Sequence, residues 1–244
     1  MNTKHFAFFI AALLLAFFGY IAWDWNETAK EVRAKQGPRD YVGSQGGGEG
    51  VVVRYVYGFP EPVVSHDYST SQIESIKWGT GNVSDVQYHI NGLTQAGYQT
   101  DAQFHCGGYK RWFKDEYVMW IDSMTVEFTY NTLNVFVSSA YPENSCQYEQ
   151  ILAHEKQHVE INREVYKEFQ EKMQERMAAV TGLPTPSHPI TTLNWDEGKE
   201  TMGKMISDTV NPVFEDFEAE LARRNGLLDS PDNYAELKNR CSSW

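Results

Sequence analysis

Cysteine is scarce in this chain, which has three among its 244 residues, at positions 106, 146 and 241. No two of them lie at a spacing typical of a thiolate zinc site, so a zinc finger or zinc ribbon is excluded. In an oxidising compartment, an odd count predicts one disulfide and one free thiol. We expect the bridge to join Cys106 and Cys146, which flank the predicted sheet, with Cys146 and Cys241 as the alternative pair. If the domain faces the cytoplasm, three buried free thiols are expected instead.

Basic residues are also few. The chain has 21 lysines and arginines against 33 acidic residues, which gives a formal net charge of −12. No basic cluster is available to neutralise phosphate groups, so a nucleic-acid-binding function is excluded. The sequence contains no internal repeat and no nucleotide-binding motif. Aromatic residues make up 14% of the chain, and this content together with the length predicts one main packed domain.

One long apolar run is present, FAFFIAALLLAFFGYIAW at residues 6–23. It has about the length that crosses a bilayer, and Trp23 and Trp25 stand where interfacial aromatic residues occur. A small-x-small cleavage site does not follow it, which favours an uncleaved transmembrane signal anchor over residues 1–25. A cleaved signal peptide is the alternative. Basic residues lie on both sides of the run, so the positive-inside rule alone does not fix its orientation.

The remainder of the chain divides into a linker and a folded domain. Residues 26–50 are polar and end in GSQGGGEG, which predicts a flexible linker. Within residues 51–244, β-branched and aromatic segments come first, and helical periodicity begins at Gln147. We therefore predict an α+β fold in which an antiparallel sheet of about four to six strands precedes two long antiparallel helices. The helices are expected at about 147–177 and 193–224, the second kinked or divided at Pro212.

The segment ILAHEKQHVEIN in the first helix carries His154-Glu155-x-x-His158. Residues four apart on a helix lie about 40° apart around the axis and one turn along it, so both imidazoles can reach one ion. Glu155 lies beside the pair, where a carboxylate can take a proton from a metal-bound water without itself being a ligand. The spacing therefore indicates a zinc site with His154 and His158 as ligands and Glu155 as general base.

The alternative interpretation is a chance pair of histidines held by ordinary hydrogen bonds. Ile161, Val165 and Phe169 continue the line of the histidines along the same helix face, so the imidazoles point toward the core. Two buried imidazoles need polar partners, and a metal ion satisfies both. The pattern thus favours the zinc site over the chance pair.

HEKQH in a long helix, preceded by a sheet and by the turn AYPENSC and behind an N-terminal export segment, resembles the zincin metallopeptidases. More narrowly, it is similar to the predicted secreted zinc-dependent proteases of Gram-negative bacteria. The resemblance covers about residues 100–244. It implies a zincin-like fold, Zn²⁺ on His154 and His158, and peptide-bond hydrolysis by Glu155 in the periplasm. It also implies that the anchor lies in the inner membrane, spanning it once.

A catalytic zinc requires a third protein ligand, and the sequence leaves it open. If the two helices form a hairpin about residue 186, residues 214–218 lie opposite the histidines, within the acidic segment FEDFEAE. Glu220 points nearest the predicted core and is the favoured ligand. The other candidates are Asp216, Glu164, Glu200, His188 and Tyr234.

Two functions follow as hypotheses. The first is a membrane-anchored extracytoplasmic zinc metallopeptidase acting on a peptide or protein substrate, held by the edge strand of the sheet. The aromatic segment LNVFVSSAY at residues 133–141 is the candidate edge strand, and a strand buried within the sheet is the alternative. The second function is a non-catalytic envelope interaction or assembly protein with a structural metal site or no metal. The segment CGGYKRWFKDEYVMW at residues 106–120 combines aromatic and basic residues. A binding surface is one interpretation of it, and a strand preceded by a turn is the favoured one.

Overall fold

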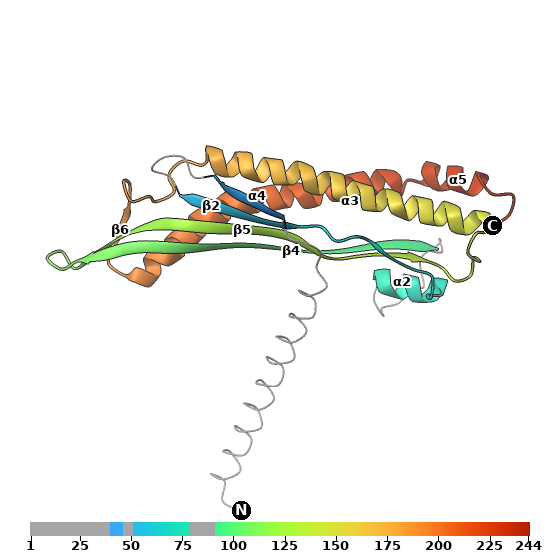
Figure 1. The fold of residues 1–244 in the computed structure, drawn as a ribbon, viewed down its shortest axis with the longest axis horizontal. Helices are drawn as coiled ribbons and strands as arrows, with labels where there is room; N and C mark the ends of the chain where they lie inside the picture. Colours follow the sequence, from blue (N-terminus) through green and yellow to red (C-terminus); the bar gives the residue numbers. More distant parts are fainter. Residues whose placement is uncertain (1–39, 46–50, 79–90) are drawn as a thin grey trace, which may run out of the picture. The chain divides into compact units, whose positions relative to one another are not determined.

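The computed structural model describes residues 40–45, 51–78 and 91–244 (Figure 1). These residues belong to one compact unit that runs from Arg39 to Trp244. The predicted anchor at 1–25 and most of the predicted linker lie outside the described residues. Among the residues that are described, no helix combines the length and the apolar character needed to cross a bilayer.

The sheet is built around one long strand, β5 (Glu116–Val137), and its other strands are β1 (Asp40–Gln45), β2 (Val52–Gly58), β3 (Val63–Ser65), β4 (Gly92–Arg111) and β6 (Ile190–Thr192). Strand β4 runs antiparallel to β5 over its whole length, and β6 is antiparallel to the first residues of β5. Strand β1 pairs antiparallel with β2, so part of the range predicted as linker is a strand.

Strands β2 and β3 run parallel to β5, so the prediction of an antiparallel sheet is wrong for these two strands and the sheet is mixed. Parallel neighbours require a long connection between them. Here the chain passes through helix α2 (Thr70–Trp78) and the whole of β4 before it reaches β5. The residue pattern identifies segments that favour strands, but it does not encode the direction in which strands far apart in the chain pair.

Strand β4 forms an edge of the sheet, because β5 is its one strand partner in the described part of the chain. The segment that the sequence suggested as an edge strand, residues 133–141, does not lie at this edge. Its first residues belong to β5, where Asn134 and Val135 pair with β3 on one side and with β4 on the other. The prediction of an edge at this segment is therefore wrong, and the buried alternative holds.

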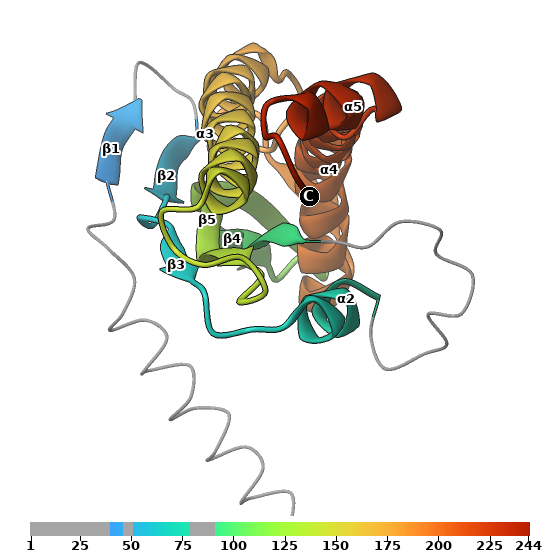
Figure 2. The same ribbon diagram turned by 90° about the vertical axis from the view of Figure 1, so that its right-hand side faces the viewer.

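Two helices of 34 residues each, α3 (Cys146–Ala179) and α4 (Trp195–Leu228), lie side by side against the sheet (Figure 2). Ser145 caps α3 by accepting a hydrogen bond from the Tyr148 N–H, and Asn194 caps α4 in the same way through Asp196. Helix α4 continues through Pro212, so of the two predicted outcomes, a kink or a division, the division does not occur. Proline costs a helix one backbone hydrogen bond, and the buried side chains that flank it offset this loss by holding α4 on the core.

The core lies between the helices and the sheet. Alternate residues of β5 point into it, and they meet apolar residues that recur at helical spacing in α3 and α4. Phe217 of α4 is completely buried and packs edge-on against Phe128 of β5, with ring centroids 4.7 Å apart. The hydroxyl of Tyr166 in α3 donates to the Phe128 carbonyl at 2.6 Å and accepts from the Gly58 N–H at 2.7 Å. This contact fixes α3 over β2 and β5.

A disulfide joins Cys146, the first residue of α3, to Cys241, which follows helix α5 (Pro231–Asn239). The predicted pair of Cys106 and Cys146 is wrong, and the alternative holds. Cys106 is a free thiol in the last third of β4. The other end of β4 is the one that contacts the start of α3, so Cys106 lies about 45 Å along the strand from this contact. A bridge across 95 residues stabilises a fold by roughly 2–4 kcal/mol.

Candidate metal centre

His154 and His158 lie one turn apart on the buried face of α3, near its first residues. Their Nε2 atoms point to the same carboxylate oxygen, Oδ1 of Asp229, at 3.1 Å from His154 and 3.0 Å from His158. The three donor atoms lie within 4.8 Å of one another. Donor atoms around a tetrahedral zinc are about 3.3 Å apart, so small side-chain adjustments would bring these three onto one ion.

Asp229 reaches the histidines because α4 ends there. It caps the helix with its N–H bonded to the carbonyls of Asn225 and Leu227, and the chain then turns through Ser230 into α5. The antiparallel course of the helices brings this end of α4 to the start of α3. Arg224, in the last turns of α4, accordingly forms an ion pair with Glu168 of α3 at 2.6 Å.

The hydrogen bonds around His158 fix the role of each ring nitrogen. Its Nδ1 lies 2.8 Å from Oδ1 of Asn225, an atom that only accepts hydrogen bonds. Nδ1 therefore carries a proton, and in the neutral ring the lone pair on Nε2 faces Asp229. Histidines that bind metals usually donate their other N–H in this way. Without a cation or a further proton, lone pairs on His158 and Asp229 would face each other.

The electrostatics of the centre favour positive charge. Burial alone would raise the pKa of Asp229, but hydrogen bonds from His154 and His158 outweigh it and hold this pKa below its usual value. Burial alone would lower the pKa of His158, but its hydrogen bonds with Asp229 and Asn225 outweigh that effect and raise the pKa. Both shifts mean that the three donor atoms stabilise a positive charge between them, whether a proton or a metal ion. The donor set therefore fits a divalent cation.

Tyr234 of α5 contacts two members of this group. Its hydroxyl lies 3.0 Å from Oδ1 of Asp229, and its ring centroid is 5.3 Å from that of His154. Burial, together with the charge of Asp229, raises the pKa of Tyr234, so the phenol stays protonated and donates a hydrogen bond to Asp229. The disulfide at Cys241 holds α5 in this position.

The Glu155 carboxylate contacts the first residues of β4, and 5% of the residue is exposed. Its Oε2 lies 2.9 Å from the Thr94 hydroxyl. A Cβ at Gly92 would come within 2.6 Å of Oε1 of Glu155, so the absence of a side chain at Gly92 allows this close approach. Burial raises the pKa of Glu155, and the nearby histidines offset part of this rise. A carboxylate with a raised pKa is a stronger base.

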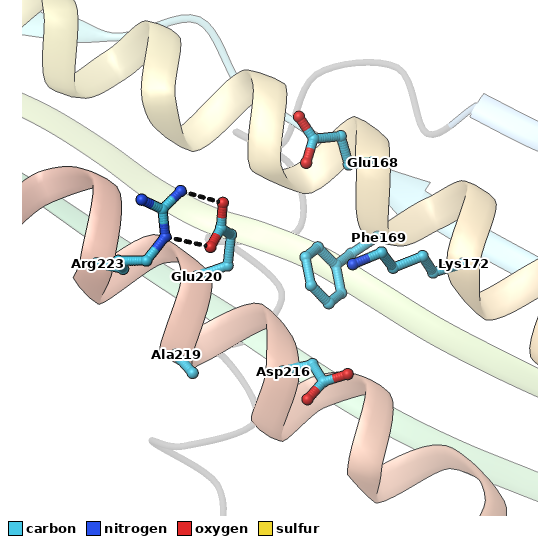
Figure 3. Close-up of a pocket in the computed structure, with 7 residues that line it drawn as sticks. All are labelled: Glu168, Phe169, Lys172, Asp216, Ala219, Glu220 and Arg223. Atoms are coloured by element: carbon cyan, nitrogen blue, oxygen red, sulfur yellow. Dashed lines mark hydrogen bonds and ion pairs between the residues drawn. The ribbon is translucent and has the colours of Figure 1, made fainter.

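The predicted third ligand, Glu220, does not reach the histidines, and this prediction is wrong in the structure. Its carboxylate instead binds Arg223 of the same helix at 2.7 Å (Figure 3). It also binds Arg224, the next residue, at 2.7 Å. The two guanidinium groups lower its pKa to about 2, so it stays ionised. Glu220 and Asp216 both line a shallow pocket between α3 and α4. Glu164 lies 3.7 Å from Arg224.

The error has a geometric cause. A hairpin about residue 186 assumed that α3 ends and α4 begins at the same level, whereas α4 begins roughly 15 Å beyond the end of α3, after the link through β6. Asn225 and Asp229 consequently take the positions opposite the histidines, about two to three helical turns beyond the predicted segment. Glu200 lies near the start of α4, and His188 lies in the link, where its ring contacts Ser187. Of the sequence candidates, Tyr234 is the one that the fold brings to the histidines.

Asp229 itself was missed. A signal was present in the segment LLDSPDNY, because Ser230-Pro231 is a typical start of a new helix and leaves Asp229 at the junction. An acidic residue at such a junction can turn its side chain toward a neighbouring helix.

In comparisons with known proteins, the chain matches no protein-family model, and no curated protein or solved structure is significantly similar to it.

Proposed function

We propose that this protein is a membrane-anchored, extracytoplasmic zinc metallopeptidase. One observation carries the proposal: Nε2 of His154, Nε2 of His158 and Oδ1 of Asp229 converge on one point beside a buried glutamate that follows the first histidine. Two imidazoles and one carboxylate form a ligand set typical of catalytic zinc, which keeps its fourth position for water or substrate. When bound, Zn²⁺ supplies Lewis acidity and makes a water molecule acidic near neutral pH.

The residues around the centre would have separate roles in binding the ion and in proton transfer. His154, His158 and Asp229 would hold the ion, and Asn225 keeps the proton of His158 on Nδ1. Glu155 accepts a proton at its carboxylate during attack on the substrate, while the Thr94 hydroxyl holds one of its oxygens. Tyr234 keeps a phenolic proton beside Asp229.

The substrate class follows from the strand next to Glu155. Strand β4 begins at Gly92 beside this side chain and has a free edge in the described part of the chain. Such an edge binds an extended chain through main-chain hydrogen bonds, which favours a peptide or an unfolded protein segment as substrate. An exposed edge beside a general base supports peptide hydrolysis over hydrolysis of a small ester.

The compartment is inferred from the disulfide and from the N-terminal sequence. A bridge such as Cys146–Cys241 is typical of oxidising compartments, and the apolar run at residues 6–23 has the length of a membrane span. We place the domain in the periplasm on a single-pass anchor in the inner membrane. Secretion after cleavage of the run is the alternative.

Removing the metal is expected to abolish hydrolysis. The full chain would be incubated with a mixture of unstructured peptides, with and without 1,10-phenanthroline, and cleavage would be read by mass spectrometry. Cleavage should stop with the chelator and return after zinc is added, because the water is activated by the ion. Cleavage that persists without metal would rule out the zinc peptidase.

Tyr234 favours one alternative, a non-catalytic envelope protein with a structural metal. Its hydroxyl lies 3.0 Å from Oδ1 of Asp229, and its ring packs beside that of His154. If the phenol became a fourth ligand, no position would remain for water. The two functions differ in the chelation experiment, since a structural site would lower thermal stability on metal removal without any cleavage to lose.

A further inference from the structure

The turn between β4 and β5 exposes two large aromatic side chains. Trp112 is 85% exposed and Phe113 is 66% exposed, and the two rings contact each other with centroids 5.8 Å apart. We call residues 109–116 the hairpin tip. It projects from the end of the long β4–β5 ribbon, beyond β6 (Figure 1). A soluble protein gains nothing in stability from two such rings in water, so the hairpin tip has the character of a contact surface.

A neighbouring segment extends the apolar character of this end of the sheet. Strand β6 ends at Thr192, which pairs with Tyr117 just beyond the hairpin tip. The next residue, Leu193, is 77% exposed. Tyr109, at the start of the hairpin tip, is also exposed and contacts Trp120 across the ribbon. Four large apolar side chains from two segments are therefore exposed at the same end of the fold.

The charge of the hairpin tip differs in sign from that of the whole chain. Its basic residues are Lys110, Arg111 and Lys114, and its acidic residues are Asp115 and Glu116, so its net charge is 3 − 2 = +1. The whole chain carries −12. A negatively charged surface therefore repels most of this protein but not the hairpin tip. Within the hairpin tip Lys110 pairs with Asp115 at 2.6 Å, and Arg111 pairs with Glu116 at 2.9 Å. The basic group left for the phosphates of lipid headgroups is Lys114, which lies next to Phe113 in the chain and 4.0 Å from Glu116.

We propose that the hairpin tip inserts Trp112 and Phe113 into the interfacial layer of an anionic lipid bilayer. Tryptophan and phenylalanine beside lysine and arginine are typical of segments that lie at a bilayer surface. A protein partner fits less well, because stable protein interfaces bury about 800 Å² on each side. A projecting turn of a few residues offers no such flat area, whereas a bilayer surrounds an inserted turn on every side.

This contact places a geometric constraint on the metal centre. Gly92 at one end of β4 lies beside Glu155, and Arg111 at the other end begins the turn. Nineteen residue steps at about 3.3 Å separate these two ends, or about 60 Å in an extended strand. A bilayer bound at the hairpin tip would thus lie at the opposite end of the ribbon from the histidines. The proposal does not depend on zinc or on peptidase activity.

The test uses the full chain reconstituted into vesicles. A Cys106→Ser, Tyr109→Cys variant carries one reactive thiol, because Cys146 and Cys241 form the disulfide, and this thiol takes an environment-sensitive nitrobenzoxadiazole label. Tyr109 is exposed and uncharged, so all three basic residues of the hairpin tip are kept. In vesicles that contain phosphatidylglycerol, we expect blue-shifted emission and quenching by brominated lipid. Both signals should weaken in vesicles of phosphatidylcholine alone, because the basic groups lose their anionic partners.

Two matched variants separate insertion from simple proximity to the membrane. Adding Trp112→Ser and Phe113→Ser should abolish the blue shift and the quenching. Adding Val63→Ser and Val64→Ser, which removes two other exposed apolar side chains, should preserve both signals. Water-like emission in phosphatidylglycerol vesicles, or quenching that survives the loss of both rings, would overturn the proposal. A blue shift already present in detergent, without quenching by lipid, would indicate contact with another protein copy and would overturn it too.

Discussion

Replacing Glu155 with glutamine is expected to lower the rate of peptide hydrolysis about 10²–10⁴-fold, the usual contribution of a general base. Glutamine has nearly the same shape and can keep the hydrogen bond with Thr94, so the contact between α3 and β4 should persist. Its amide does not accept a proton near neutral pH. Glu155 is not one of the three converging donor groups, so zinc should remain bound.

The measurement compares peptide cleavage and zinc content in the same preparations. Glu160→Gln is the matched control, because Glu160 lies on α3 as well but is exposed and pairs with Arg163. The control should cleave at the wild-type rate. Wild-type cleavage by Glu155→Gln would remove this residue from the mechanism, and loss of zinc from this variant would show that Glu155 belongs to the metal site itself.

Replacing Asp229 with alanine is expected to reduce zinc affinity by more than the 10–100-fold that loss of an outer hydrogen-bond partner typically costs. The change removes one of three direct donor atoms and leaves two imidazoles without their common partner. It also removes the negative charge that stabilises a cation at this point. Competition with a chromogenic chelator would give the affinity, and circular dichroism would report whether α3 and α4 remain folded.

Glu220→Ala is the control for this experiment, and it also separates the two candidate third ligands. Glu220 was favoured by the sequence, but in the structure it binds Arg223 and Arg224. Its loss should leave zinc affinity unchanged, since its carboxylate is not one of the converging donors. If Glu220→Ala lost zinc and Asp229→Ala retained it, the hairpin predicted about residue 186 would be the better description.

The sequence predicted the parts of the site that depend on local geometry. Helical spacing alone places His154 and His158 on one face, and the structure puts both on the buried face of α3. The α+β class was likewise readable, because apolar periodicity changes from strand-like to helical near Gln147. The helix bounds were close for the same reason, since the second helix was expected at about 193–224 and α4 runs from Trp195 to Leu228.

The remaining parts depend on contacts between distant segments. Asp229 meets the histidines because α4 ends at one particular residue and is displaced along α3 by a particular distance, and neither quantity follows from periodicity. Strands β2 and β3 are parallel to β5 because the chain passes through α2 and β4 first. Cys146 pairs with Cys241 because α5 returns to the start of α3. For the ligand, the strand direction and the disulfide alike, the residue pattern allows several arrangements, and the tertiary structure determines which one forms.

The central claim is that His154, His158 and Asp229 form a metal site, and elemental analysis tests it most directly. Zinc would be measured in the purified full chain beside a His154→Ala, His158→Ala double variant, with melting curves for both. We predict one zinc ion per wild-type chain and none in the variant. A wild-type chain that contains no metal, even after exposure to zinc, would contradict the claim and leave the three side chains as a hydrogen-bonded cluster.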